Sequence, residues 1–290
     1  MPQADTTIVA NHRWQARLLQ WLILAGLLAG IYWKDLILWA AQLWDDPNYS
    51  HGLLIPFVSI YFVRERFEDL KASRSAPFLP ALLLVVAALT LYILGYIGAE
   101  FFSKRISFVL LLYGMILFLE GKKVAQILFF PVFILFFAVP LPYILYNAIA
   151  FPLKLIASQV SAVIFDLAGI PVFREGNIIS LPHTTLEVVD ACSGIRSLMT
   201  LLTLSFFLAY FQHRAIWRQV LVFVMALPIA VVANASRVSL TGILTMYDPR
   251  WGEGSLHDFS GWLVFIVSFA GLGLVSTLLR SRKNSKRTKG

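Results

Sequence analysis

Three side chains that can take part in chemistry lie near the ends of three successive apolar stretches. Cys192, the one cysteine of the chain, precedes the first stretch, Arg237 lies near the end of the second, and His257 opens the third. A thiol can act as a nucleophile, a guanidinium can stabilise negative charge, and an imidazole can transfer protons near neutral pH. These residues predict a catalytic site if the three ends lie on the same side of a membrane.

Cys192 stands in the sequence Ala191-Cys192-Ser193-Gly194, directly before an apolar segment that we expect to be helical. The first amides of a helix are unpaired and the helix dipole places partial positive charge there, so a thiol at this position favours the thiolate form. A free cysteine is also commonly a buried, unreactive side chain. Both interpretations of Cys192, nucleophile and structural residue, remain open at this point.

Arg237 interrupts an apolar run from Val220 to Leu244. An arginine in a membrane helix costs about 2.5–3.5 kcal/mol on insertion scales, so such charges are usually paired or functional. Asn234 and Thr241 lie at helical spacing from it, which predicts a polar stripe facing protein or a cavity. The alternative is an arginine that reaches the membrane interface. Arg196, about one turn beyond Cys192, is the second candidate for a catalytic arginine.

His257 is followed directly by Asp258. The carboxylate could orient the imidazole, although adjacent residues of a helix point about 100° apart. The alternative is a histidine at the membrane interface that hydrogen-bonds to water.

The composition places the chain in a membrane. Hydrophobic residues make up 59% of the 290 residues, charged residues 14%, and the mean hydropathy is +0.75. Soluble domains carry about 25% charged residues, and backbone groups inside a bilayer must be paired, so the spans are helices. We interpret the net charge of +8 as an orientation signal with contact to membrane lipid, not as nucleic-acid binding. One cysteine excludes an internal disulfide and a cysteine-based metal cluster, and we expect no metal or cofactor.

The hydropathy pattern predicts an all-α polytopic membrane protein with about eight spans and one further apolar segment. The expected spans cover 18–38, 52–63, 77–99, 106–119, 124–147, 193–211, 218–243 and 258–279. Residues 150–169 contain Lys154 and Asp166, so we expect them to lie in the interface or to re-enter the membrane. Because basic residues are retained on the cytoplasmic side, eight crossings place both termini inside and the three candidate residues at the outer face.

The sequence predicts a single integral membrane domain over 1–290, with two small parts outside the membrane. Residues 170–191 combine short apolar pairs with the turn Glu175-Gly176-Asn177, which predicts a small β-hairpin element on the outer face. This element leads into Cys192. Residues 280–290 form a basic tail that we expect in the cytoplasm.

The ordered set Ala191-Cys192-Ser193-Gly194, Asn234-x-x-Arg237 and His257 resembles the exosortases, a family of bacterial membrane cysteine transpeptidases. Ser50-His51-Gly52-x-x-x-Pro56 and Pro140-Leu141-Pro142 resemble that family too, so the likeness covers residues 48–275.

The resemblance implies a site in which Cys192 is the nucleophile, Arg237 stabilises the transition state and His257 is the acid–base residue. It also implies a membrane-anchored protein substrate with a C-terminal sorting signal, made of a Pro-Glu-Pro motif, a membrane helix and a basic cluster. The implied location is the bacterial inner membrane, with the site on the periplasmic side. The alternative from a different class is a transporter or polysaccharide-export component without peptidase activity, in which Arg237 and His257 line a pathway.

Overall fold

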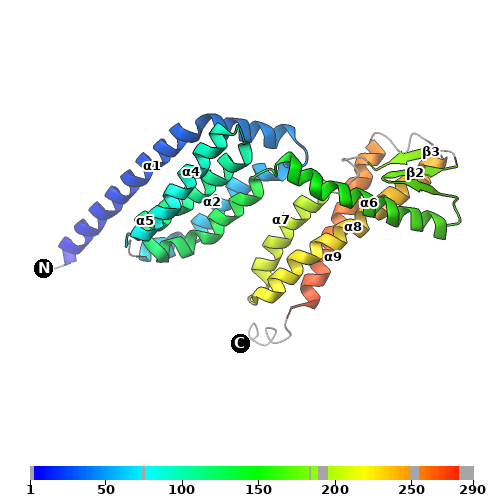
Figure 1. Ribbon diagram of the computed structural model, residues 1–290. Helices are drawn as coiled ribbons and strands as arrows, with labels where there is room; N and C mark the ends of the chain where they lie inside the picture. Colours follow the sequence, from blue (N-terminus) through cyan, green and yellow to red (C-terminus); the bar gives the residue numbers. More distant parts are fainter. Residues whose placement is uncertain (1–2, 74–75, 183, 189–194, 248–254, 281–290) are drawn as a thin grey trace, which may run out of the picture. The chain divides into compact units, whose positions relative to one another are not determined.

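The computed structural model describes residues 3–73, 76–182, 184–188, 195–247 and 255–280. Side chains are described from Leu19 onward within these ranges, except those of Ile195, Tyr247 and 255–258. The chain is mostly helical and carries one small sheet (Figure 1). It forms two compact units: unit 1 comprises Met1–Asp46 and Gly52–Pro140, and unit 2 comprises Pro47–His51 and Leu141–Gly290.

Unit 1 is helical, and its core lies where its first, fourth and fifth α-helices meet. Leu28 and Tyr32 of the first helix are buried against Ala88 and Leu111 of the other two. These apolar positions recur at helical spacing, which gives each helix one face for the core. The elements are α1 (Gln3–Asp45), η1 (Ser50–Leu53, shared with unit 2), α2 (Ile55–Glu65), α3 (Phe67–Ala72), η2 (Leu79–Ala81), α4 (Leu82–Ile97), α5 (Phe101–Phe133) and η3 (Ile134–Ala138).

Helix α5 consists of two helical segments that meet at Gly121. This glycine has φ 84° and ψ −178°, which lies outside the helical region and is accessible to glycine at no steric cost. A β-carbon at Gly121 would stand 2.0 Å from the carbonyl oxygen of Ala76. The first segment packs on α4, and the second contacts α2, where Ser59 donates a hydrogen bond to the carbonyl of Pro131 at 2.7 Å.

Contacts at the two ends of unit 1 show how the chain runs between them. At one end, the indole of Trp21 donates to the Glu120 carboxylate at 2.7 Å, and the amide of Ala76 donates to the Glu120 carbonyl at 3.2 Å. At the other end, the indole of Trp39 donates to the Ala138 carbonyl at 2.8 Å, close to Gly52. The segment from Gly52 to Ala76, which includes the short helix α2, therefore runs from one end of unit 1 to the other.

Unit 2 is built around one long helix. The helices are α6 (Tyr143–Leu167), α7 (Ile195–Gln212), α8 (Ile216–Tyr247) and α9 (Ser255–Leu278). The first half of α8 packs against α7 and α9 through a cluster that includes Leu198, Ala226 and Leu272. The second half packs against α6, where the buried Ser161 hydroxyl donates to the Ala235 carbonyl at 3.1 Å.

A three-stranded antiparallel sheet lies in unit 2 beside α6 and α8 (Figure 1). Its strands are β1 (Phe173–Glu175), β2 (Ile178–Leu181) and β3 (Thr184–Glu187), in the order β1-β2-β3. The pairs Glu175–Ile178 and Leu181–Thr184 close the two turns, each of two residues. Gly176 has φ 62°, which the first turn requires. The predicted β-element is therefore present as a sheet of three strands.

Within the described residues, six helices are long and apolar enough to cross a membrane. They cover Leu19–Asp45, Leu79–Ile97, Phe101–Ala138, Tyr143–Leu167, Ile216–Met246 and Phe259–Leu278. The chain is thus a multi-pass membrane protein, but the predicted number of eight spans is not confirmed. The predicted spans 52–63 and 193–211 correspond to α2 and α7, with 11 and 18 residues, and neither is among the six.

Two predicted boundaries are wrong, and both lie near Pro140 and Pro142. The span predicted over 124–147 ends at Ala138, and residues 143–147 belong to α6 instead. Proline lacks an amide donor and disfavours helix in the residue before it, so this pair of prolines separates two helices. Residues 150–169, predicted as a separate interfacial or re-entrant segment, form most of the continuous 25-residue helix α6.

Candidate active site

The nucleophile predicted from the sequence, Cys192, lies outside the described residues, but the structure describes the chain on both sides of it. Four residues before it, Val188 is buried and its amide donates to the Asn177 carbonyl at 2.9 Å, as a continuation of β3. Three residues after it, helix α7 begins at Ile195. The short segment that carries Cys192 therefore connects a strand anchored in the sheet to the first turn of a helix.

Arg237 lies in α8 and its side chain reaches α9. Its Nε donates to the Ser260 hydroxyl at 3.4 Å. A β-carbon added at Gly261 would stand 3.0 Å from Nη2 and 3.1 Å from Cζ of Arg237. The guanidinium therefore lies against the backbone of α9 at a position where glycine leaves room for it.

Asn234 and Ser239 are the buried polar residues that flank Arg237 in α8. Asn234 is one turn earlier and buried, and the buried Ser239 hydroxyl donates to the Ala235 carbonyl at 2.9 Å. Polar side chains thus follow this part of α8 on faces that are covered by protein. Ser239 lies about 200° around the helix from Arg237, so it is not part of the predicted polar stripe, of which Asn234 is buried and Thr241 is partly buried.

His257 and Asp258 belong to the first turn of α9 by their backbone, and their side chains are not described. Residue 257 precedes Ser260 by three positions and Gly261 by four. Residues at these spacings lie on the same face of an α-helix, about one turn apart. The structure therefore brings the Arg237 guanidinium to the helix face on which position 257 also lies.

Arg196, the second candidate arginine, has a different partner. It is exposed in the first turn of α7, and its Nε lies 3.5 Å from Oδ1 of Asn48. Asn48 belongs to the segment Pro47–His51, which joins unit 2 although it is far from it in sequence. In the same segment Tyr49 is buried, and its hydroxyl accepts from the Leu141 amide at 3.2 Å. No local pattern in the sequence links Asn48 or Tyr49 to α7, so neither residue was predicted to lie there.

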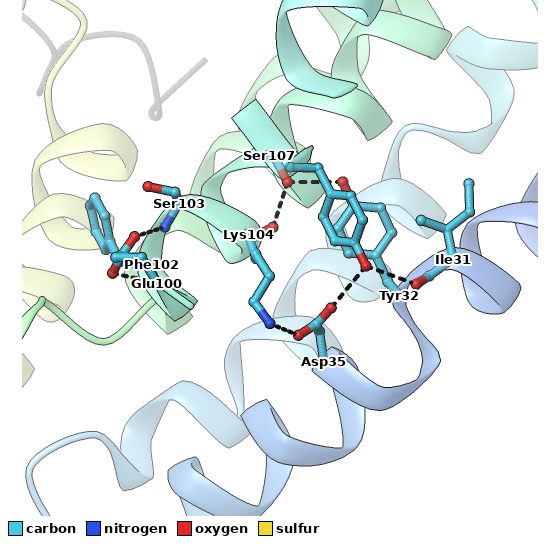
Figure 2. A network of polar contacts seen from close by, with 9 residues as sticks. Ile31, Tyr32, Asp35, Glu100, Phe102, Ser103, Lys104 and Ser107 are labelled. Atoms are coloured by element: carbon cyan, nitrogen blue, oxygen red, sulfur yellow. Dashed lines mark hydrogen bonds and ion pairs between the residues drawn. The ribbon is translucent and has the colours of Figure 1, made fainter. Parts of the chain in front are cut away.

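A second polar cluster, in unit 1, was also missed from the sequence. Figure 2 shows Asp35 of α1 paired with Lys104 of α5, and Tyr32 joined to Ser107. The Tyr92 hydroxyl of α4 donates to Asp35 at 3.1 Å, so the cluster ties three helices together. Arg105 is 5% exposed, and its guanidinium lies 5.9 Å and 5.7 Å from the ring centroids of Trp39 and Phe101. Lys104 and Arg105 are a pair of basic residues within an otherwise apolar stretch, which was the available signal.

Glu100 caps the helix that carries this cluster. Its carboxylate accepts hydrogen bonds from the amides of Phe102 and Ser103, at 2.9 Å and 2.6 Å. Burial alone would raise the pKa of Glu100, but the hydrogen bonds from Ser103 and Phe102 and the charge of Arg105 outweigh it and lower that pKa. The carboxylate is therefore ionised at neutral pH and stabilises the start of α5.

Among the residues that the structure describes, no group of three or more His, Cys, Asp and Glu side chains is arranged to hold a metal ion. Near Arg237 the arrangement offers a guanidinium that contacts Ser260 and Gly261 of α9, and a guanidinium can stabilise a developing oxyanion.

Comparison with models of protein families identifies the family to which the chain belongs. The model of the transmembrane exosortase family matches residues 39–274, which include the sheet, α8 and most of α9. Comparisons with curated proteins and with solved structures return no match. The family match covers most of the chain and agrees with the resemblance of its motifs, and the chain therefore belongs to the exosortases, a family of membrane cysteine transpeptidases.

Proposed function

We propose that this chain is a cysteine transpeptidase of the bacterial inner membrane, with Cys192, Arg237 and His257 as its catalytic residues. Its substrates are membrane-anchored proteins with a C-terminal sorting signal, and cleavage takes place at the periplasmic face. The sorting signal consists of a Pro-Glu-Pro motif, a membrane helix and a basic cluster. Family membership supports the reaction class.

The observation that carries the residue assignment is the contact of Arg237 with α9. The guanidinium bonds to Ser260 and lies over Gly261, one helical turn from position 257. Arg196 instead contacts Asn48. Of the two arginines, Arg237 is thus the one that contacts α9 within about a turn of position 257, which supports it for the catalytic role.

In the proposed mechanism, the Cys192 thiolate attacks the carbonyl carbon of the scissile peptide. The electron pair of the carbonyl bond moves to oxygen, and the guanidinium of Arg237 stabilises this oxyanion. The intermediate collapses, the C–N bond breaks, and protonated His257 gives its proton to the leaving amine. A thioacyl-enzyme remains. An acceptor amine, or water, attacks it and releases the thiolate of Cys192, while neutral His257 takes the proton of the attacking nucleophile.

Asp258 and Asn234 have supporting roles in this proposal. Asp258 orients the imidazole or balances its charge, and the buried Asn234 keeps the region around Arg237 polar. Neither is required to touch the reacting atoms.

The test is a processing assay in living cells. A reporter protein with a Pro-Glu-Pro sorting signal is co-expressed with the wild type or with Cys192→Ala, Arg237→Ala, His257→Ala or Arg196→Ala. We expect the wild type to shorten the reporter. The first three variants should lose at least about a hundredfold in rate, as expected for loss of a nucleophile, an oxyanion donor or an acid–base group. Arg196→Ala should process within a few-fold of wild type and serves as the matched arginine control.

The amount of each variant in the membrane is measured by immunoblot, so that loss of activity is separated from loss of protein. Normal processing by Cys192→Ala would overturn the nucleophile assignment and bring the transporter alternative forward. Equal loss in Arg196→Ala and Arg237→Ala would remove the basis for preferring Arg237. Trapping of an acyl acceptor on the cleaved reporter distinguishes transpeptidation from hydrolysis.

A further inference from the structure

We propose that the free edge of strand β3 binds the extended substrate segment that precedes the scissile bond, as a fourth strand of the sheet. This inference rests on the proposed function, because it assumes that the substrate is a peptide. It specifies how the peptide is held, which the catalytic residues alone do not.

The backbone groups of β3 point alternately toward β2 and away from it. In an antiparallel pair, opposite residues alternate between hydrogen-bonded and non-hydrogen-bonded pairs. Leu181 and Thr184 close a two-residue turn and so form a hydrogen-bonded pair. At the other end of the strand, the Val188 amide donates to the Asn177 carbonyl at 2.9 Å. Val188 is four residues after Thr184, so this bond fits the same alternation. The amides and carbonyls of Thr184, Leu186 and Val188 therefore face β2.

The intervening residues face the other way. Thr185 and Glu187 lie opposite Ser180 and Ile178 in non-hydrogen-bonded pairs, so their amides and carbonyls point out of the sheet edge. No backbone hydrogen bond to another described residue is found for either, and both residues are exposed. Within the part of the chain that the structure describes, β3 thus offers two donors and two acceptors to an added strand.

Strand β3 is held in place by the packing of one face, while its edge is left open. Leu186 faces the core, where a β-carbon on Gly242 of α8 would stand 2.6 Å from Leu186 Cδ1. Its cross-strand partner Ile179 is fully buried, and Val188 is 1% exposed. One face of the strand is therefore packed, and an added strand would pair with an edge that is already in its bound conformation.

The opposite edge of the sheet is a poorer candidate. Strand β1 has three residues, and only Arg174 directs its amide and carbonyl outward. The Arg174 side chain is already bonded to the carbonyl of Gly176 at 2.7 Å, and β1 packs on α6. The chain that follows β3, in contrast, reaches Cys192 five residues after Glu187.

This continuity fixes the direction of the peptide. In sequence, strand β3 leads through Cys192 into α7, which packs against the candidate spans α8 and α9. A substrate whose C-terminal part is a membrane helix must run toward the membrane in the same direction. Its segment before the scissile bond therefore lies parallel to β3, with main-chain hydrogen bonds at Thr185 and Glu187 and the scissile carbonyl near Cys192.

The enzyme-side test replaces one outward donor. Thr185→Pro removes the Thr185 amide hydrogen, and proline is tolerated on an edge strand whose amide faces outward. Loss of one backbone hydrogen bond should lower the processing rate about five- to tenfold. Thr185→Ala keeps the amide and should process like the wild type. Equal loss in both variants would assign the effect to the side chain and would overturn the proposal.

The substrate-side test does not depend on the folding of any variant. Single prolines are placed in turn at each residue before the scissile bond of the reporter, and processing by the wild-type enzyme is measured. A peptide paired with β3 should show alternation, with strong loss at every second position where an amide faces β3. A smooth or irregular profile would overturn the proposal.

The two tests separate this inference from the proposed function. A wild-type enzyme that leaves the unmodified reporter intact contradicts the proposed function. Processing that depends on Cys192 but shows neither the alternation nor the Thr185→Pro effect leaves the proposed function standing and rejects the role of β3.

Discussion

At the scale of single residues, the position of the Arg237 guanidinium against α9 depends on residue 261 being a glycine. A methyl group there would lie within 3.0–3.3 Å of three guanidinium atoms. The guanidinium is the far end of a flexible side chain, so it can move aside without disturbing the helices. The position of the charge is therefore more sensitive to this residue than the fold is.

We expect Gly261→Ala to accumulate normally and to process the reporter about tenfold to a hundredfold more slowly, because a small displacement of a catalytic group costs rate without costing stability. Gly271→Ala is the matched control in the same helix, since a β-carbon there meets nothing within 4 Å. The measurement is the processing rate normalised to the amount of protein in the membrane. Equal rates for the two variants would show that the guanidinium position does not matter.

His213, in the turn between α7 and α8, is a buried histidine with a shifted pKa. It is 3% exposed, and its Nε2 lies 2.9 Å from the Ser276 hydroxyl, which donates to Gln212. Burial and the charges of Arg218 and Arg280 lower the pKa of His213 below its ordinary value of 6.5. Protonation therefore favours the unfolded chain, and stability is lost as the pH falls below about 6.5.

The corresponding prediction is a thermal unfolding midpoint, measured in detergent, that falls between pH 7.5 and pH 5. In His213→Gln the amide can still bond to Ser276 but does not titrate, so the fall should be smaller. A variant with the same pH dependence as the wild type would show that other groups cause it.

At the scale of elements, the ion pair of Asp35 and Lys104 joins α1 to α5 inside unit 1. Their side chains are 11% and 10% exposed, whereas the pair of Glu68 and Lys71 in α3 is 84% and 47% exposed. Removing one partner of a buried pair leaves an uncompensated charge, which costs about 3–5 kcal/mol, while an exposed pair contributes about 0–1 kcal/mol. Removing one partner should therefore lower the free energy of unfolding much more for the buried pair than for the exposed pair.

We expect Lys104→Met to lower the unfolding midpoint strongly and Lys71→Met to leave it nearly unchanged. The double variant Asp35→Leu/Lys104→Met should regain much of the loss, because it removes both charges. In that variant the Tyr92 hydroxyl keeps the Ile31 carbonyl as a partner, at 3.2 Å. A double variant as unstable as Lys104→Met would mean that packing, not charge, holds the helices there.

The sequence predicted the helices around the candidate site well and α6 poorly, for a physical reason. Polar residues in 150–169 argued against a helix continuous with its neighbours in the membrane. In the structure Ser158 donates to the Gly176 carbonyl and Ser161 to the Ala235 carbonyl, 18 and 74 residues away. Such partners satisfy the polar groups only after the chain has folded, so a local pattern cannot reveal them.

At the scale of the whole molecule, the charge pattern still predicts the orientation. In unit 1, Lys122 lies at the end where Trp21 meets Glu120, with its ammonium 4.3 Å from the centroid of the Phe78 ring. The positive-inside rule predicts that this end is cytoplasmic. Eight crossings would then place the basic tail inside, with residues before and after α6 on the same side.

Reporter fusions test this orientation. Alkaline phosphatase, which is active only outside the cytoplasm, should be active when fused after Pro140 and after Ala168, and inactive when fused after Arg280. Activity after Pro140 with none after Ala168 would show that α6 crosses the membrane and would contradict the expected number of crossings.

How much could be predicted also differs with scale. The three candidate residues, the sheet and most helix positions follow from local patterns of hydropathy and turn residues. The partners of Arg237 and Arg196 do not, because Ser260 lies 23 residues away in sequence and Asn48 lies 148 residues away. The sequence predicts a chemistry for the candidate site, which stays a prediction, but it does not show which helices and loops meet there.

The segment Pro47–His51 has a consequence for how the protein is made. It is synthesised between two parts of unit 1 but belongs to unit 2. Its partner Arg196 leaves the ribosome 148 residues later than Asn48, about 7–30 s at a synthesis rate of about 5–20 residues per second. Unit 1 can assemble in that interval, whereas these five residues must wait for the second half of the chain. No single cut divides the protein into its two units: a cut after Pro140 leaves unit 1 whole but removes Pro47–His51 from unit 2.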